Sequence, residues 1–138
     1  MSKRISRFVT IALCALVISV LWPQTNVAHA SSAGCTLGYD ETYTCLGIYG
    51  SGTHVDSFRV SYNKTYRTIC AYQAKVTVTS PAGTTWTYWS SKHTGCSFNT
   101  AWFDFEVNRS YPSGSRACGF FYERGEYRGA KPCNTIKS

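Results

Sequence analysis

The sequence predicts an all-β domain: a disulfide-stapled, antiparallel β-sandwich of immunoglobulin-like architecture. Apolar and polar residues alternate along segments rich in Val, Thr, Tyr, Phe and Trp, with turn residues between them. No window after residue 30 has helical periodicity. Six cysteines follow residue 30, an even number typical of disulfide frameworks. Because two packed sheets bury such alternating strands best, we expect about seven strands over residues 45–138.

Three strands are expected in the first half of the domain, at 45–49, 57–62 and 70–79. Side chains of Phe58, Val60 and Tyr62 should share a buried face, because successive strand residues point to opposite sides. The third strand is the most regular, and a Ser-Pro-Ala-Gly turn at 80–83 should end it. Its predicted core face consists of Cys70, Tyr72, Ala74, Val76 and Val78.

Four further strands are expected, at 84–91, 101–107, 118–122 and 133–137, the last as an edge strand. In the first of these, Trp86 and Tyr88 share a face, so Trp89 should point the other way. Trp102 should likewise lie opposite the core face of its strand. In the next strand we expect the core face to hold Cys118, Phe120 and Tyr122.

Residues 1–30 are typical of a secretory signal peptide. The stretch has a basic start at Lys3, Arg4 and Arg7, then an apolar run at 8–21 that is too short to span a membrane. It ends in Ala28-His29-Ala30, with small residues at the cleavage positions. We therefore expect a secreted, extracellular protein without a membrane span in the mature chain.

Residues 31–44 are rich in Gly, Ser and Thr and show little periodicity. They predict an extended N-terminal arm, attached to the domain only through Cys35. One interpretation, which the composition favours, is a flexible stub. The other is a segment that adds as a strand to the sheet edge of a partner.

The cysteines predict disulfides rather than a metal site. Cys35 and Cys45, the nearest two, are ten positions apart, whereas zinc sites usually need closely spaced ligand pairs. Bridges between Cys70 and Cys96 and between Cys118 and Cys133 would join neighbouring strands, which leaves Cys35 with Cys45. The count alone permits about 15 pairings. No metal or other cofactor is expected.

The charge pattern does not favour nucleic acid as a partner. After residue 30 the chain carries 11 Lys and Arg against 7 Asp and Glu, a net charge of +4. These basic residues are scattered singly, whereas a nucleic-acid binder usually concentrates them along one stripe. We therefore expect no nucleic-acid binding.

Two groups of residues could carry catalysis. Asp104 and Glu106 share a strand face and could form a glycosidase-like carboxylate pair, although solvated strand faces carry charges routinely. A hydrolase triad could be drawn from His54, Asp56 and either Ser57 or Ser61. No Gly-x-Ser-x-Gly turn accompanies these residues. We therefore expect no catalytic residues and no enzyme activity.

Aromatic residues are the strongest candidates for a binding surface. Outward-facing Trp89 and Trp102 could form a flat platform, because exposed aromatic rings anchor interfaces and stack on sugars. The alternative is that the rings pack in the core, where large aromatics usually lie. Our candidate binding residues are Trp89, Trp102, Tyr127, Tyr39 and Tyr43.

The chain resembles small secreted six-cysteine proteins of actinobacteria. The resemblance rests on the Gly-rich run 47–52, on His54-Val55-Asp56, on Trp102-Phe103 and on the cysteine spacing up to Pro132-Cys133. It covers nearly the whole mature chain. In size, export and cysteine use the chain is also similar to the small adaptor subunits of umbrella toxin particles, which link a stalk to lectin-bearing subunits. This resemblance implies an adaptor role, in which the arm would be the inserted element.

These observations favour a secreted, non-catalytic binding or adaptor protein with an extracellular protein partner. One alternative is a carbohydrate or cell-wall binding module that uses Trp89 and Trp102. Another is an extracellular protease inhibitor, whose exposed loop would be 92–95 next to Cys96.

Overall fold

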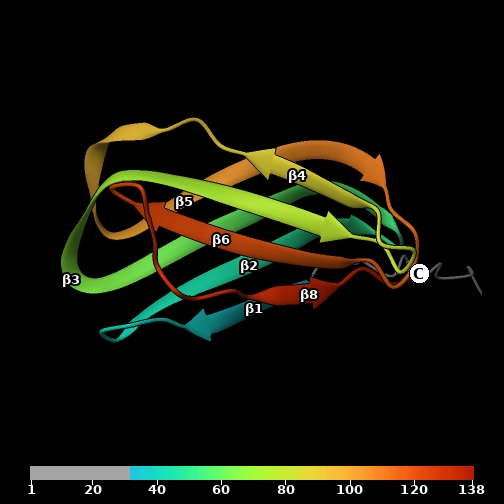
Figure 1. The fold of residues 1–138 in the computed structure, drawn as a ribbon, viewed down its shortest axis with the longest axis horizontal. Helices are drawn as coiled ribbons and strands as arrows, with labels where there is room; N and C mark the ends of the chain where they lie inside the picture. Colours follow the sequence, from blue (N-terminus) through green and yellow to red (C-terminus); the bar gives the residue numbers. More distant parts are fainter. Residues whose placement is uncertain (1–31) are drawn as a thin grey trace, which may run out of the picture.

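The computed structural model describes residues 32–138, and the expected signal peptide at 1–30 lies outside them. The described chain is all-β, and every strand pairing in it is antiparallel, as predicted (Figure 1). The described residues contain no helix that could cross a membrane. The eight strands of the described chain are β1 (Ser32–Leu37), β2 (Thr42–Ser51), β3 (His54–Thr79), β4 (Thr85–Trp89), β5 (His93–Ser110), β6 (Arg116–Glu123), β7 (Glu126–Tyr127) and β8 (Cys133–Thr135).

The 26-residue strand β3 divides the sheet into two halves. The first half-sheet consists of β1, β2, residues 54–63 of β3 and residues 100–110 of β5. The second half-sheet consists of residues 68–79 of β3 with β4, β6, β7, β8 and the start of β5. Strands β3 and β5 therefore both pass from one half-sheet to the other (Figure 1).

A bulge at residues 64–67 marks this passage. The pairing of Asn63 with Thr100 is followed by that of Thr68 with Phe98, so four residues of β3 face one residue of β5. Within the bulge, the Tyr66 amide donates a hydrogen bond of 2.7 Å to Asn99 Oδ1. Extra residues bend a strand and increase its twist. The two separate strands predicted at 57–62 and 70–79 are therefore one bent strand.

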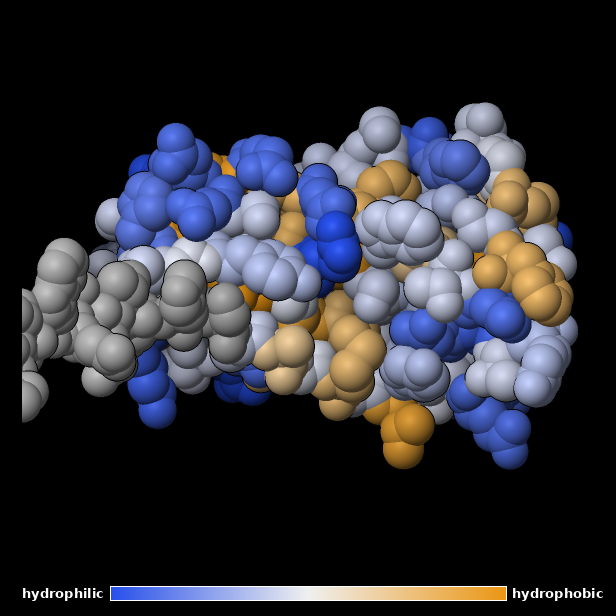
Figure 2. Space-filling model, turned by 180° about the vertical axis from the view of Figure 1, so that it is seen from behind, coloured by the Kyte–Doolittle hydropathy of each residue, from blue (hydrophilic) through white to orange (hydrophobic). Residues whose placement is uncertain are grey.

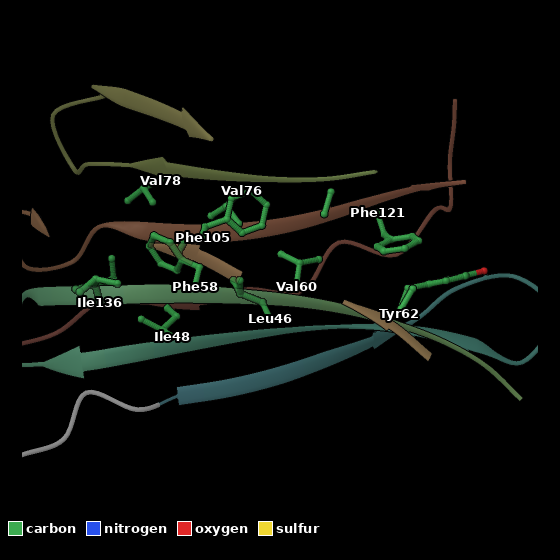
Figure 3. Packing of buried hydrophobic residues seen from close by; sticks show 14 of the residues in the cluster. Leu46, Ile48, Phe58, Val60, Tyr62, Val76, Val78, Phe105, Phe121 and Ile136 are labelled. Carbon is green, nitrogen blue, oxygen red and sulfur yellow. The ribbon is translucent and has the colours of Figure 1, made fainter. Parts of the chain in front are cut away.

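The core lies between the two half-sheets (Figure 3). Phe58 approaches Tyr88 of β4 with ring centroids 6.4 Å apart, and Tyr62 stacks on Phe121 of β6 at 4.7 Å. Burial of such side chains is the main favourable contribution to folding. The predicted core residues that are buried here are Phe58, Val60, Tyr62, Tyr72, Ala74, Val76 and Val78, and Ala101 and Phe105 of β5 are buried with them.

The predicted core face of β6 is wrong for Phe120 and Tyr122, although its third member, Cys118, is buried. Phe121 is fully buried, whereas Phe120 and Tyr122 are only partly buried and lie on the outer face. Ala117 and Gly119 share the face of Phe121. A Cβ atom at Gly119 would lie 3.2 Å from Val60 Cγ2, which is closer than such atoms usually pack, so glycine suits the place where β6 approaches β3. The small residues of β6 therefore decide which of its faces turns inward.

The three predicted disulfides are confirmed. Bridges join Cys35 to Cys45, Cys70 to Cys96 and Cys118 to Cys133. In each case the two cysteines are direct partners in the strand register, with Cα atoms 4.0 to 4.1 Å apart. Each bridge therefore fixes the register of one strand pair. Three disulfides are consistent with an extracellular or otherwise oxidising environment.

The N-terminal segment differs from the extended arm predicted at 31–44. Strand β1 pairs with β2 from Ser32 opposite Ile48 to Leu37 opposite Tyr43. Main-chain hydrogen bonds as well as Cys35 therefore hold the segment, and it is neither a stub nor a free arm. The expected boundary at residue 45 falls inside β2. The edge strand expected at 133–137 is present as β8.

Candidate binding faces

The outer face of the second half-sheet brings a lysine and several aromatic residues together. Alternation along β3 turns Lys75 outward, between the buried Ala74 and Val76. The strand register then places Trp89 of β4 on one side of Lys75 and Phe120 of β6 on the other. A lysine flanked by two aromatic rings is thus a direct consequence of three alternating strands.

Lys75 interacts with three of these rings. Its Nζ atom lies 5.0 Å from the ring centroid of Trp89, 4.4 Å from that of Phe120 and 5.8 Å from that of Tyr122. An ammonium group within about 6 Å of an aromatic centroid is attracted by the ring, by roughly 0.5–1 kcal/mol at exposed sites. The lysine therefore holds neighbouring rings of the surface in position.

Tyr127 of β7 extends the surface. Its ring centroid lies 5.7 Å from that of Tyr122 and 5.8 Å from that of Phe120. Tyr122 in turn lies 5.4 Å from Trp89, so the rings form one connected group. We call this group the lysine–aromatic face, and it consists of Lys75, Trp89, Phe120, Tyr122 and Tyr127.

The lysine–aromatic face is accessible and cationic. Trp89 is 52% exposed and Tyr127 is 42% exposed. A hollow of about 190 Å³ beside Trp89 is lined by Gln73, Lys92 and Tyr122 among others. A further ammonium group, Lys131 Nζ, lies 5.3 Å from the Phe120 centroid. The face thus combines half-exposed rings with several lysines.

Burial raises the pKa of Tyr127 above its ordinary value, and the nearby phenols of Tyr122 and Tyr39 raise it further. The Tyr127 hydroxyl therefore stays protonated at neutral pH. It can both donate and accept a hydrogen bond at the edge of the face.

Trp102 lies on the other half-sheet, so the predicted platform of Trp89 and Trp102 does not form. Trp102 is directly opposite Ser61 in the first half-sheet, and the hollow beside it is lined by Arg59, Ser61 and Thr100. Because β5 changes half-sheet near residue 99, the two tryptophans lie on outer faces of different half-sheets. Alternation in the sequence predicts the outward orientation of both tryptophans. It does not predict that β5 passes from one half-sheet to the other.

The two candidate tyrosines near the N-terminus also separate. Tyr39 lies in the turn between β1 and β2, is 72% exposed, and packs against Gly129 near Tyr127. Tyr43 lies on β2, opposite Asn63 in the first half-sheet. The structure thus places Tyr39 beside the lysine–aromatic face and Tyr43 on the half-sheet of Trp102.

Seen from behind, the molecular surface mixes hydrophobic with hydrophilic side chains (Figure 2).

One member of the carboxylate pair considered for glycosidase chemistry forms an ion pair with an arginine. Arg59 binds Asp104 through two hydrogen bonds, Nε to Oδ1 at 2.6 Å and Nη2 to Oδ2 at 2.9 Å. This contact raises the pKa of Arg59. Glu106 is exposed on the same strand. Asp104 therefore has a cationic partner rather than the apolar pocket that would raise the pKa of a general acid.

His54 contacts a serine that the sequence analysis did not consider. His54 Nδ1 lies 3.0 Å from Ser110 Oγ, and its Nε2 lies 2.9 Å from Asn108 Oδ1 and 3.5 Å from Asp56 Oδ1. The serine within hydrogen-bond distance of His54 is thus Ser110 rather than the predicted Ser57 or Ser61. The start of β3 pairs with the end of β5, and this pairing brings the cluster together. Local sequence patterns do not predict such a long-range contact.

The segment predicted as an inhibitor loop, 92–95, is largely part of a strand. Residues 93–95 belong to β5, and the His93 ring packs on Tyr72 with centroids 4.5 Å apart, so 92–95 is not a free loop. Within residues 32–138, no group of three or more His, Cys, Asp and Glu side chains could hold a metal ion.

A buried carboxylate lies at the junction of the half-sheets. Glu123 Oε2 lies 3.1 Å from Lys64 Nζ and 3.8 Å from Arg128 Nε, and Glu123 Oε1 accepts a hydrogen bond of 3.2 Å from the Cys70 amide. A buried charge with such partners is satisfied. This cluster is therefore explained by the architecture, because it ties β6 to the bend of β3.

Together the fold and the surfaces define a class: a small all-β protein with three cross-strand disulfides and an exposed lysine–aromatic face. Comparison with protein-family models and with curated proteins finds no match for the chain.

Proposed function

We propose that the protein is a secreted, non-catalytic binding or adaptor protein that engages an extracellular protein through the lysine–aromatic face. Its scaffold, on this proposal, is an immunoglobulin-like β-sandwich. The observation that carries the proposal is the connected ring group of Trp89, Tyr122, Tyr127 and Phe120 around Lys75. Trp and Tyr are enriched among the residues that dominate the energetics of protein interfaces.

The rigidity of the face supports this proposal. Side chains on paired strands lose little conformational freedom on binding, because the sheet and the cation–π contacts already hold them. The cationic groups Lys75, Lys92 and Lys131 would complement an acidic partner surface. An acidic protein surface with an apolar centre is therefore the expected partner.

The secreted location and the adaptor role are part of the same proposal. The three disulfides support an oxidising compartment, which agrees with the signal peptide expected at 1–30. The similarity to the small adaptor subunits of umbrella toxin particles in size, export and cysteine use supports a role in a toxin complex. An adaptor must hold two partners, and this chain offers outer faces on two different half-sheets.

Capture of the partner tests the proposal. Tagged full-length protein would be recovered from its own culture supernatant under native conditions, and co-purifying proteins identified by mass spectrometry. We expect a stoichiometric partner with the wild type and its loss with Trp89→Ala. Tyr66→Ala is the matched control, because Tyr66 is an exposed aromatic at the bend of β3 and should not contribute. A folded Trp89→Ala protein that retains the partner would refute the proposal.

A further inference from the structure

The outer face of the first half-sheet contains a second, chemically different surface around Trp102. This side chain is 55% exposed and borders a hollow of about 300 Å³. Arg59, Ser61 and Thr100 line the rest of the hollow. One large ring is therefore surrounded by polar groups.

The polar groups around Trp102 are held in fixed positions. The two hydrogen bonds between Arg59 and Asp104 fix both side chains. Thr100 Oγ1 donates a hydrogen bond of 2.7 Å to Asn63 Oδ1. These contacts leave three guanidinium N–H donors of Arg59 and further lone pairs of Asp104 for other partners. Donors and acceptors thus lie side by side without a net charge.

Strand β2 borders the same surface on its other side. Tyr49 and Tyr43 point outward from β2, opposite Ser57 and Asn63 of β3. The Tyr49 ring lies across Gly47, where a Cβ atom would be 3.1 Å from it. Ser57, Arg59 and Ser61 of β3 lie between Trp102 of β5 and the tyrosines of β2 in the order of the sheet. We call this surface, around the hollow beside Trp102, the trough.

We propose that this trough binds a neutral saccharide, with one pyranose ring stacked on Trp102 and its hydroxyl groups bonded to the Arg59–Asp104 pair. A pyranose has an apolar C–H face that suits an indole ring. Its adjacent hydroxyls are both donors and acceptors, and they match the paired guanidinium and carboxylate groups. Charge complementarity favours a neutral ligand, because the two charges of the pair offset each other. This site is independent of the proposed protein partner.

Calorimetric titration of the secreted protein tests the site. The probes are hexasaccharides of glucose, N-acetylglucosamine and mannose, with an oligogalacturonate as the anionic comparison. We expect at least one neutral hexasaccharide to bind and the anionic one to bind more weakly. Trp102→Ala should weaken that binding at least tenfold, or about 1.4 kcal/mol. Asp104→Asn should weaken it to a lesser extent, because it keeps the shape of the side chain but not its charge.

Trp89→Ala is the control, and it should leave saccharide affinity unchanged. Near-ultraviolet circular dichroism would establish that each variant is folded, and Trp102→Phe, which keeps an aromatic ring, should retain part of the affinity. The inference is overturned by three outcomes: no binding of any neutral probe, full affinity in folded Trp102→Ala, or loss of affinity in Trp89→Ala instead. None of these outcomes bears on capture of the protein partner.

Discussion

At the residue scale, Lys75 and Gly119 show how single positions shape both faces of the second half-sheet. Lys75 makes cation–π contacts with three rings on the outside. Gly119, on the inside, lets β6 approach Val60 and Leu46. The two residues belong to neighbouring strands. Alternation turns Lys75 outward and Gly119 inward, and each residue suits the face on which it lies. Function and packing are thus assigned to opposite faces of the same strands.

Gly119→Ala should destabilise the protein by about 1–3 kcal/mol, because the added methyl group would lie 3.2 Å from Val60 Cγ2 and overpack the core. Chemical denaturation would measure the difference. Gly95→Ala is a suitable control, since a Cβ atom there would meet the exposed His93 side chain and not the core. Equal stabilities of the two variants would show that the approach of β6 to Val60 is not tight.

We predict that the folded protein loses stability in alkali because of Tyr111. Burial, followed by its 2.7 Å hydrogen bond with Tyr88, raises the pKa of Tyr111 well above its ordinary value of 10.0. The native state therefore holds this proton more tightly than the unfolded chain, and the resulting stability is complete below about pH 10 and falls as the pH rises further. Denaturation of wild type and Tyr111→Phe at about pH 9 and pH 11 would measure it. The wild type should lose more stability than the variant, and equal losses would contradict the assignment.

At the scale of elements, much of the sheet was predictable and its continuity was not. Alternation identified the buried faces of β3 and the outward direction of Trp89 and Trp102, because those segments have a clear period of two. The bulge at 64–67 has no glycine or proline to signal it, so β3 was predicted as two strands. Strand β1 was missed because its pairing with β2 is through the main chain, and its six residues show no alternation of apolar and polar side chains.

The candidate site could be predicted only in part for the same reasons. Three consecutive aromatics, Phe120, Phe121 and Tyr122, make the phase of β6 ambiguous in the sequence. Packing against Val60 resolves the phase, because it requires Gly119 inside and hence Phe120 outside. The meeting of Lys75 with Trp89 depends on strand register, which local sequence does not fix.

The Cys35–Cys45 bridge should act locally. Strand β1 pairs with β2, lies largely exposed and is joined to it by this bridge, so Cys35→Ser/Cys45→Ser should fray β1 while the core remains folded. Amide hydrogen exchange should show faster exchange confined to β1 and its partner residues in β2. In the matched variant Cys118→Ser/Cys133→Ser the faster exchange should move to β8. Uniform acceleration across β3 and β6 would contradict this local role.

At the scale of the whole molecule, one small chain presents two outer faces of different chemistry. The lysine–aromatic face is cationic and rich in connected rings, whereas the trough around Trp102 is polar and carries an offset ion pair. The bent strands β3 and β5 link the two half-sheets covalently, and three disulfides fix their registers. A protein that joins a macromolecular partner to a saccharide surface would need this kind of rigid, two-faced scaffold.

The most direct test of the central claim is the affinity of the captured protein partner for wild type, Trp89→Ala and Trp102→Ala. We predict that Trp89→Ala weakens binding at least tenfold, about 1.4 kcal/mol, and that Trp102→Ala binds as the wild type does. Added salt should weaken the wild-type complex, because Lys75 and its neighbours would face the acidic surface of the proposed partner. The account would be contradicted if folded Trp89→Ala kept full affinity, or if Trp102→Ala were the variant that lost it.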